Sequence, residues 1–288
     1  MELSLAAWPR AFKFIGDSHA ARFDGLVFRD ASQTRYVITQ AHNHYGFRAS
    51  EFSSEDGSLN ERLARSLLTL NIVRGTRENA IPQLGRFRTA REPLGTEFGM
   101  RLRVSHRREL VVISCGEVDA RDVISRLPLD ARIAMTDPIG RFPDDPPGDA
   151  EAIPQAALAE EIESEYLRPL FRGLSTLHDI GMENLYLLAL PPPGLSDDDY
   201  GAHCGFASRR HVRYAVHRTI NALYERFCRD RGISYLDTWP LVTSPEGILL
   251  PDYGSDSVHL NRNAALAIVA ELGRRTAGAP DLQLDPLV

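Results

Sequence analysis

Short apolar segments alternate with long amphipathic segments along most of this chain, and no other feature constrains its fold as much. We predict strands at residues 11–15, 36–39, 110–115, 184–190 and 233–237. We predict helices at residues 59–73, 155–180, 209–231 and 262–275. Strands that alternate with helices of this length favour parallel pairing, because each helix returns the chain across one face of the sheet. The pattern therefore predicts an α/β fold with helices on both faces.

No fixed-period repeat and no low-complexity linker divides the sequence, which favours one domain over residues 1–288. Loop insertions are expected around 75–108, 137–152 and 191–207. The last two contain several prolines and glycines, which interrupt regular structure. Loops after the carboxyl ends of the strands form the ligand crevice in open α/β sheets. We therefore expect these two loops to wall a binding site.

Composition excludes several kinds of partner. The net charge of −6 argues against nucleic acid, because phosphate contacts need clustered basic side chains. No apolar stretch approaches the ~20 residues of a membrane span, so no membrane partner is expected. Cys115, Cys204 and Cys228 have no paired spacing, which favours a reducing compartment and predicts a cytoplasmic protein. No cofactor is expected, and the sequence leaves the oligomeric state open.

Two short polar motifs carry the chemistry. Gly16-Asp17-Ser18-His19 follows the first predicted strand, and Asp256-Ser257-Val258-His259 precedes the last predicted helix. A serine nucleophile needs a base, and the base needs a group that orients it. Taken alone, Asp17 or Ser18 could simply cap a helix, and His259 could be a surface residue beside a turn. Their joint presence in one α/β pattern indicates a serine hydrolase or acyltransferase.

These motifs resemble the first and last sequence blocks of the SGNH/GDSL hydrolases, in the second case as Asp256-x-x-His259 followed by Leu-Asn. The resemblance spans nearly the whole chain, because the two blocks lie near its ends. It implies a three-layer α/β/α, flavodoxin-like fold with a mainly parallel five-stranded sheet. It also implies Ser18 as the nucleophile, His259 as the general base and Asp256 as the group that orients the imidazole.

The family's third block, Gly-x-Asn-Asp, should follow the central strand, where this chain reads Gly116-Glu117-Val118-Asp119-Ala120-Arg121. Valine at the asparagine position cannot donate a hydrogen bond, and losing one oxyanion donor typically costs about 10²–10³ in rate. Arg121 is the best substitute, because its guanidinium offers several N–H donors and a permanent charge. This form of the block resembles a branch of the family found in bacterial proteins, some of them tied to glycans or secondary metabolites.

Glu117 would repel an oxyanion unless it is paired, and we expect an ion pair with Arg121, Arg22 or His19. The alternative is a purely structural pair of Glu117 and Arg121 that caps the following helix. Glu117 and Arg121, together with Gly116, Asp17 and His19, are the residues that we expect to bind the oxyanion or the substrate.

The family's remaining block supplies a glycine N–H to the oxyanion hole. Gly46, in the segment after the second strand, is our choice, with Gly75 and Gly85 as alternatives. The neighbouring His42-x-His44 pair invites a metal site, but two ligands do not make one and no third ligand stands nearby. No metal is therefore expected.

His203 and Cys204 lie in the loop at 191–207 and either line the crevice or have no function. The expected substrate is a small-molecule or glycan ester, cleaved through a covalent acyl-enzyme. The alternatives are an acyltransferase with the same three residues, and a binding module of the same fold that has lost catalysis.

Overall fold

The computed structural model describes residues 12–29, 36–69, 110–135, 152–179, 182, 184–245 and 247–276. The predicted insertion at 75–108 and residues 137–151 of the next one lie outside this part of the chain.

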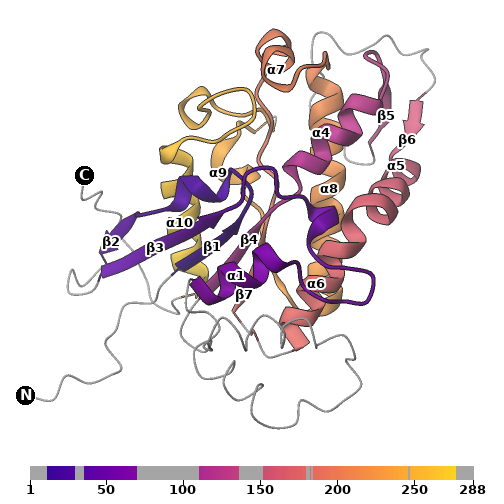
Figure 1. The fold of residues 1–288 in the computed structure, drawn as a ribbon. Helices are drawn as coiled ribbons and strands as arrows, with labels where there is room; N and C mark the ends of the chain where they lie inside the picture. The colour runs from indigo at the N-terminus through magenta and orange to yellow at the C-terminus, as the bar shows by residue number, and fades with distance from the viewer. Residues whose placement is uncertain are drawn as a thin grey trace, which may run out of the picture.

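Five parallel strands form the centre of the molecule (Figure 1). In sequence order they are β1 (Phe12–Gly16), β3 (Tyr36–Asn43), β4 (Leu110–Ser114), β7 (Leu185–Leu188) and β8 (Ser234–Leu236). In space the order is β3-β1-β4-β7-β8, and every neighbouring pair is parallel. This is the flavodoxin-like strand order, so the predicted mainly parallel sheet is confirmed.

Two further pairings were not predicted. Strand β2 (Val27–Arg29) adds a sixth, antiparallel strand at the β3 edge of the described sheet. Strands β5 (Arg132–Ala134) and β6 (Ala152–Pro154) form a separate parallel pair. All three are only three residues long. A strand of that length leaves little apolar pattern in the sequence unless, like β8, it directly follows the glycine that ends a long helix.

Helices cover both faces of the sheet, which gives the predicted three-layer arrangement (Figure 1). One layer consists of α1 (Glu61–Thr69), α4 (Glu117–Arg126), α5 (Gln155–Ile162), α6 (Arg168–Asp179) and α8 (Arg210–Arg231). The other consists of the 3₁₀ helix η2 (Ala20–Phe23), α9 (Trp239–Val242) and α10 (Arg262–Thr276). A π-helical turn, Glu163–Leu167, joins α5 to α6, so the helix predicted at 155–180 is nearly continuous.

Each strand contributes side chains to the cores on both faces of the sheet, because successive side chains point to opposite faces. In β4, Val111 and Ile113 belong to the core beneath α4, α6 and α8. Leu110 and Val112 belong to the core beneath α10. Every residue of this strand is buried, which explains its uninterrupted apolar sequence.

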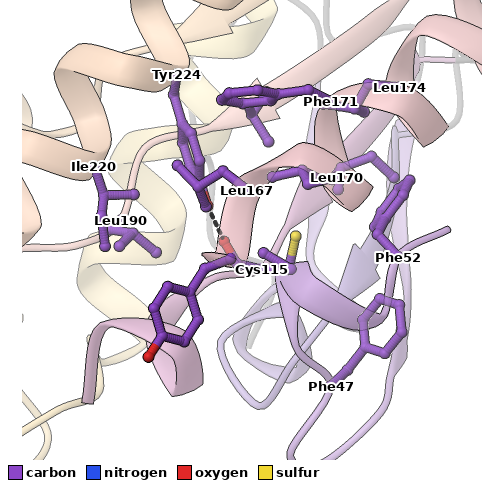
Figure 2. Packing of buried hydrophobic residues seen from close by; sticks show 14 of the residues in the cluster. Phe47, Phe52, Cys115, Leu167, Leu170, Phe171, Leu174, Leu190, Ile220 and Tyr224 are labelled. Atoms are coloured by element: carbon purple, nitrogen blue, oxygen red, sulfur yellow. Dashed lines mark hydrogen bonds between the residues drawn. The ribbon is translucent and has the colours of Figure 1, made fainter. Parts of the chain in front are cut away.

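The larger core also fixes the point where β4 leads into α4. Figure 2 shows Tyr224 reaching from α8 to the backbone of Cys115, whose oxygen accepts its hydroxyl proton at 2.9 Å. The next residue, Gly116, has a φ of +107°, and a Cβ there would lie 2.2 Å from the Tyr224 oxygen. Only glycine satisfies both conditions, so the start of α4 is held rigidly at the carboxyl edge of the sheet.

The segment 191–207, predicted as a loop, contains a helix, α7 (Asp197–Cys204). Ser196 caps its start by accepting the Asp199 N–H at 3.1 Å, and three acidic residues occupy its first turn. Gly205 ends it in the left-handed conformation. None of the helices that the structure describes combines the length and apolar character needed to cross a membrane.

Candidate active site

Ser18 stands on a tight turn at the carboxyl end of β1. Gly16 passes so close to β4 that a Cβ there would lie 1.6 Å from the Ser114 carbonyl oxygen. The Asp17 N–H donates to the same oxygen at 3.0 Å, and the Asp17 carboxylate accepts the His19 N–H at 3.0 Å. These contacts hold the turn against the sheet and leave Ser18 partly exposed between two buried neighbours.

His259 lies in a loop before α10 that is organised by the Asp256 carboxylate. Its Oδ1 accepts the N–H of Val258 at 2.8 Å and that of His259 at 2.7 Å. Its Oδ2 lies 2.9 Å from Nδ1 of the His259 ring. The Ser255 N–H donates to the His259 carbonyl at 2.9 Å and closes the loop. Asp256 thereby holds the imidazole at Nδ1, and Nε2 remains available to another partner.

That partner is Ser18, whose Oγ lies 2.8 Å from His259 Nε2. Helix η2, which follows Ser18, packs against α10, which follows His259. The two loops therefore meet because the elements behind them share one core. The structure thus brings Ser18, His259 and Asp256, predicted from opposite ends of the sequence, into one hydrogen-bonded chain.

Protonation states follow from the surroundings of this chain. Burial, aided by the charges of Arg22 and His203, lowers the pKa of His259 although its Asp256 partner raises it, so the ring is neutral at pH 7. Burial raises the pKa of the Asp256 carboxyl, but the N–H groups of Val258 and His259 and the His259 ring outweigh that effect and keep it ionised. A neutral ring beside a carboxylate carries its proton on Nδ1. Nε2 is then an acceptor aimed at the Ser18 hydroxyl.

Two other imidazoles flank His259. The His19 ring lies 4.9 Å away between centroids, and the His203 ring lies 5.8 Å away in an edge-on arrangement. His19 is buried, and this burial holds its pKa well below the usual value. A neutral His19 therefore packs against the base without adding a positive charge.

A buried pair of acids lies next to the serine turn. Burial, followed by the charge of Glu117, raises the pKa of Asp17 to about 8. Burial raises the pKa of Glu117 to about 7, although the charge of Arg121 opposes the shift. Each residue is 1% exposed. At neutral pH the pair therefore retains a proton, as two carboxyls close together in a dry site must.

Helix α4 carries the block in which valine replaces asparagine. Glu117 Oε2 lies 2.8 Å from Arg121 Nη2, so the predicted ion pair forms with Arg121. The Arg121 side chain remains 26% exposed and also hydrogen-bonds to Cys204 of α7.

Val118 is partly exposed and offers no donor. Asp119 accepts the Ala49 N–H at 2.6 Å and so ties α4 to the segment after β3.

The remaining predicted positions lie in and after β3. The His44 N–H donates to the Gly16 carbonyl at 2.7 Å, which joins this segment to the serine turn. Gly46 is exposed at a turn with a φ of +71°, and its part in an oxyanion hole stays a prediction.

The His42 and His44 rings lie 4.8 Å apart, with His44 Nε2 2.6 Å from Ser66 Oγ. In the described part of the chain, no three His, Cys, Asp or Glu residues are arranged to hold a metal ion.

Sequence reasoning missed how α7 reaches the site. Arg213 of α8, fully buried, donates to Asp197 Oδ1 at 2.7 Å and to the Gly194 carbonyl at 3.0 Å. Its guanidinium also lies 4.5 Å from the centre of the Tyr200 ring. These contacts dock α7 so that His203 and Cys204 approach His259 and Arg121. The capping serine and the acidic first turn at 196–199 are the signal that would have identified the helix.

A parallel α/β sheet whose carboxyl edge presents a Ser–His–Asp chain is an arrangement suited to nucleophilic catalysis. No protein-family model matches this chain, and no curated protein has a matching sequence.

Solved structures match over most of its length. An extracellular lipase from Streptomyces rimosus is 14% identical, with 92% of this chain and 99% of that chain covered and a TM-score of 0.44. A carbohydrate acetylesterase from Sinorhizobium meliloti is 11% identical, with 93% and 99% covered and a TM-score of 0.42. A GDSL-like lipase from Bacteroides thetaiotaomicron is 13% identical, with 93% and 88% covered and a TM-score of 0.40.

Proposed function

We propose that the protein is a serine esterase that cleaves small-molecule or glycan esters through a covalent acyl-enzyme. In this proposal Ser18 is the nucleophile, His259 the general base and Asp256 the group that orients and stabilises the imidazole. The supporting observation is that Ser18 Oγ lies 2.8 Å from Nε2 of His259, while Asp256 Oδ2 lies 2.9 Å from Nδ1 of the same ring. Neutral Nε2 is in position to accept the serine proton.

The reaction has two halves. Ser18 Oγ attacks the ester carbonyl while His259 Nε2 takes its proton. The bond to the leaving alcohol breaks as the proton passes from His259 to the alcohol oxygen, and the acyl group stays on Ser18. Water repeats the sequence in reverse and releases the acid. An alcohol in place of water would make the protein an acyltransferase with the same three residues.

The oxyanion formed in each half needs donors, and Val118 supplies none. We propose Arg121 as the substitute. Support comes from its exposed fraction, its place on α4 beside the serine turn, and its charge, which acts on the pKa values of Asp17 and His19. The Glu117 ion pair fixes one side of the guanidinium. The other N–H groups supply the donors that this role requires. Gly46 remains the proposed backbone donor.

The second candidate is a binding module that has lost catalysis, and Val118 is the observation that favours it. A fluorophosphonate probe separates the two, because it reacts only with an activated serine. We expect wild-type protein to be labelled and to turn over p-nitrophenyl acetate. Ser18→Ala and His259→Ala should abolish both signals, whereas Ser125→Ala at an exposed position of α4 and His178→Ala at the end of α6 should retain them. A wild-type protein with neither signal would refute the esterase and leave the binding module.

A further inference from the structure

The last turn of helix α7 meets the proposed base directly. His203, in this turn, presents its ring to His259 edge-on, with 5.8 Å between the ring centroids and 67° between the ring planes. This separation and angle lie in the range that interacting aromatic rings prefer. His203 is exposed, so the position of its ring is set by the helix that carries it and not by burial in a core.

Helix α7 is bonded to the rest of the site near both of its ends. In its first turn, Asp197 accepts a hydrogen bond from the buried Arg213 at 2.7 Å. In its last turn, Cys204 hydrogen-bonds to Arg121, the proposed oxyanion donor. Two consecutive side chains of this turn, His203 and Cys204, therefore contact two different groups of the proposed machinery.

The His259 ring is held at its two nitrogens and packed against two other rings. Asp256 Oδ2 lies at Nδ1 and Ser18 Oγ at Nε2. The buried ring of His19 lies 4.9 Å away between centroids, at an angle of 37°. The His259 side chain is only 15% exposed. Hydrogen bonds fix the nitrogens, and the packed rings oppose tilting of the imidazole plane.

We propose that His203 is a positioning residue for the base, whose ring, carried by α7, holds the His259 imidazole in line with Ser18. The proposal rests on the esterase function above. It makes a residue outside the Ser–His–Asp chain necessary for full turnover, although that residue touches none of the reacting bonds.

His203 also acts on the charge of the base. Burial lowers the pKa of His259, Asp256 raises it, and the positive charges of Arg22 and His203 lower it again. His19, the other group facing the ring, is neutral because burial holds its pKa well below the usual value. A neutral ring in place of His203 would therefore keep the packing but remove one charge that opposes protonation of His259.

The test compares two substitutions at this position. His203→Ala removes the ring, whereas His203→Phe keeps an aromatic ring without a titratable nitrogen. His178→Ala at the end of α6 is the matched control. We would measure kcat and KM for p-nitrophenyl acetate between about pH 5 and pH 8, with the melting temperature as a check on folding. Because His203 is exposed, both variants should fold.

We expect His203→Ala to lower kcat at pH 8 about tenfold with little change in KM. This is less than the 10²-fold cost of a misplacement by 1 Å, since two hydrogen bonds still hold the imidazole. His203→Phe should keep kcat within about twofold of wild type. Its acidic inflection should lie about half a pH unit higher, the effect of one charge about 6 Å away in water. His178→Ala should match wild type in both respects.

Two outcomes would overturn the positioning role and leave the esterase intact. One is an unchanged kcat in His203→Ala, including the case in which only KM rises because His203 contacts the substrate instead. The other is a loss in His203→Phe as large as that in His203→Ala, since the ring would then not be the positioning group. Failure of wild-type protein to cleave the ester would instead overturn the esterase and this assignment with it.

Discussion

The Gly194 N–H donates to the Ser257 carbonyl oxygen at 2.9 Å, and a Cβ on Gly194 would lie 2.8 Å from Ser257 backbone atoms. The loop after β7 thus presses directly on the loop that carries His259, two residues further on. No side chain fits between them, so the position of the imidazole depends on glycine at 194.

Gly194→Ala should therefore displace the His259 loop. We expect a loss of about 1–3 kcal/mol in the free energy of unfolding, as for other overpacked sites. The proposed esterase rate should fall about 10²-fold, because reacting groups misplaced by 1 Å lose that much. Gly201→Ala on α7 is the control, since its Cβ would meet nothing closer than 3.7 Å. Equal activity in the two variants would show that this contact does not position the base.

The pH dependence of the reaction reports the protonation of His259. The base must be neutral, and burial lowers its pKa below the usual 6.5. We expect kcat/KM for p-nitrophenyl acetate to rise with pH through an inflection below 6.5 and to be level at pH 7. An inflection above pH 7 would mean that a different group acts as the base.

Asp256→Asn should lower kcat about 10³–10⁴-fold without unfolding the protein, because an amide at this position favours the wrong tautomer of the imidazole. The acidic inflection of any residual activity should move to lower pH, since the charge that raises the pKa of His259 is gone. Kinetics on protein with an unchanged melting temperature make the measurement. Full activity in this variant would exclude an orienting role for Asp256.

Removal of the proposed oxyanion donor should affect kcat more than KM. Arg121→Met alone would leave Glu117 buried without its partner, so the informative protein is Glu117→Gln/Arg121→Met. We expect kcat to fall about 10²–10³-fold. Arg126→Met on the same helix removes an exposed ion pair with Asp122 and should change kcat little. If the double variant keeps wild-type kcat, the oxyanion is stabilised by other groups.

The buried acids make stability depend on pH. The pKa of Asp17 is about 8 when folded, against an ordinary value of 3.8. Between these values the unfolded chain releases a proton that the folded protein keeps, so the free energy of unfolding should decrease as pH rises from about 4 to about 8. Asp17→Asn should flatten this slope and raise stability at pH 8 by an amount on the order of a few kcal/mol. Asp198→Asn, on the surface, should leave the slope unchanged. Denaturant titrations at pH 5 and pH 8 measure both.

The periodic parts of the fold were predictable because strands and helices leave different spacings of apolar residues. The parallel strands, α8 and α10 all fall where this spacing placed them. β2 was missed because it has three residues and, unlike the equally short β8, no long helix ending in glycine before it. α7 was missed because it has one buried residue, Tyr200, and hence no apolar stripe. The local evidence for α7 was the Ser196 cap, the acidic first turn and Gly205 at its end.

The approach of Ser18 to His259 was predictable because both motifs follow the ordering rule for parallel sheets, in which loops after the strands gather at one edge. The approach of His203 to His259 was not, since it depends on how Arg213 docks α7. The glycine that completes an oxyanion hole has no signature either, because a backbone N–H belongs to every residue except proline.

The 241 positions that separate Ser18 from His259 have a consequence for synthesis. A nascent chain that has left the ribosome as far as β8 holds the five strands of the described parallel sheet and the serine turn, yet it lacks His259, whose Nε2 faces the Ser18 hydroxyl. Because a domain generally folds as a unit, the site cannot be complete before the segment that carries His259 has been synthesised. If the proposed esterase is correct, reactivity toward esters would therefore begin only after the segment before α10 has been synthesised and packed against the serine turn.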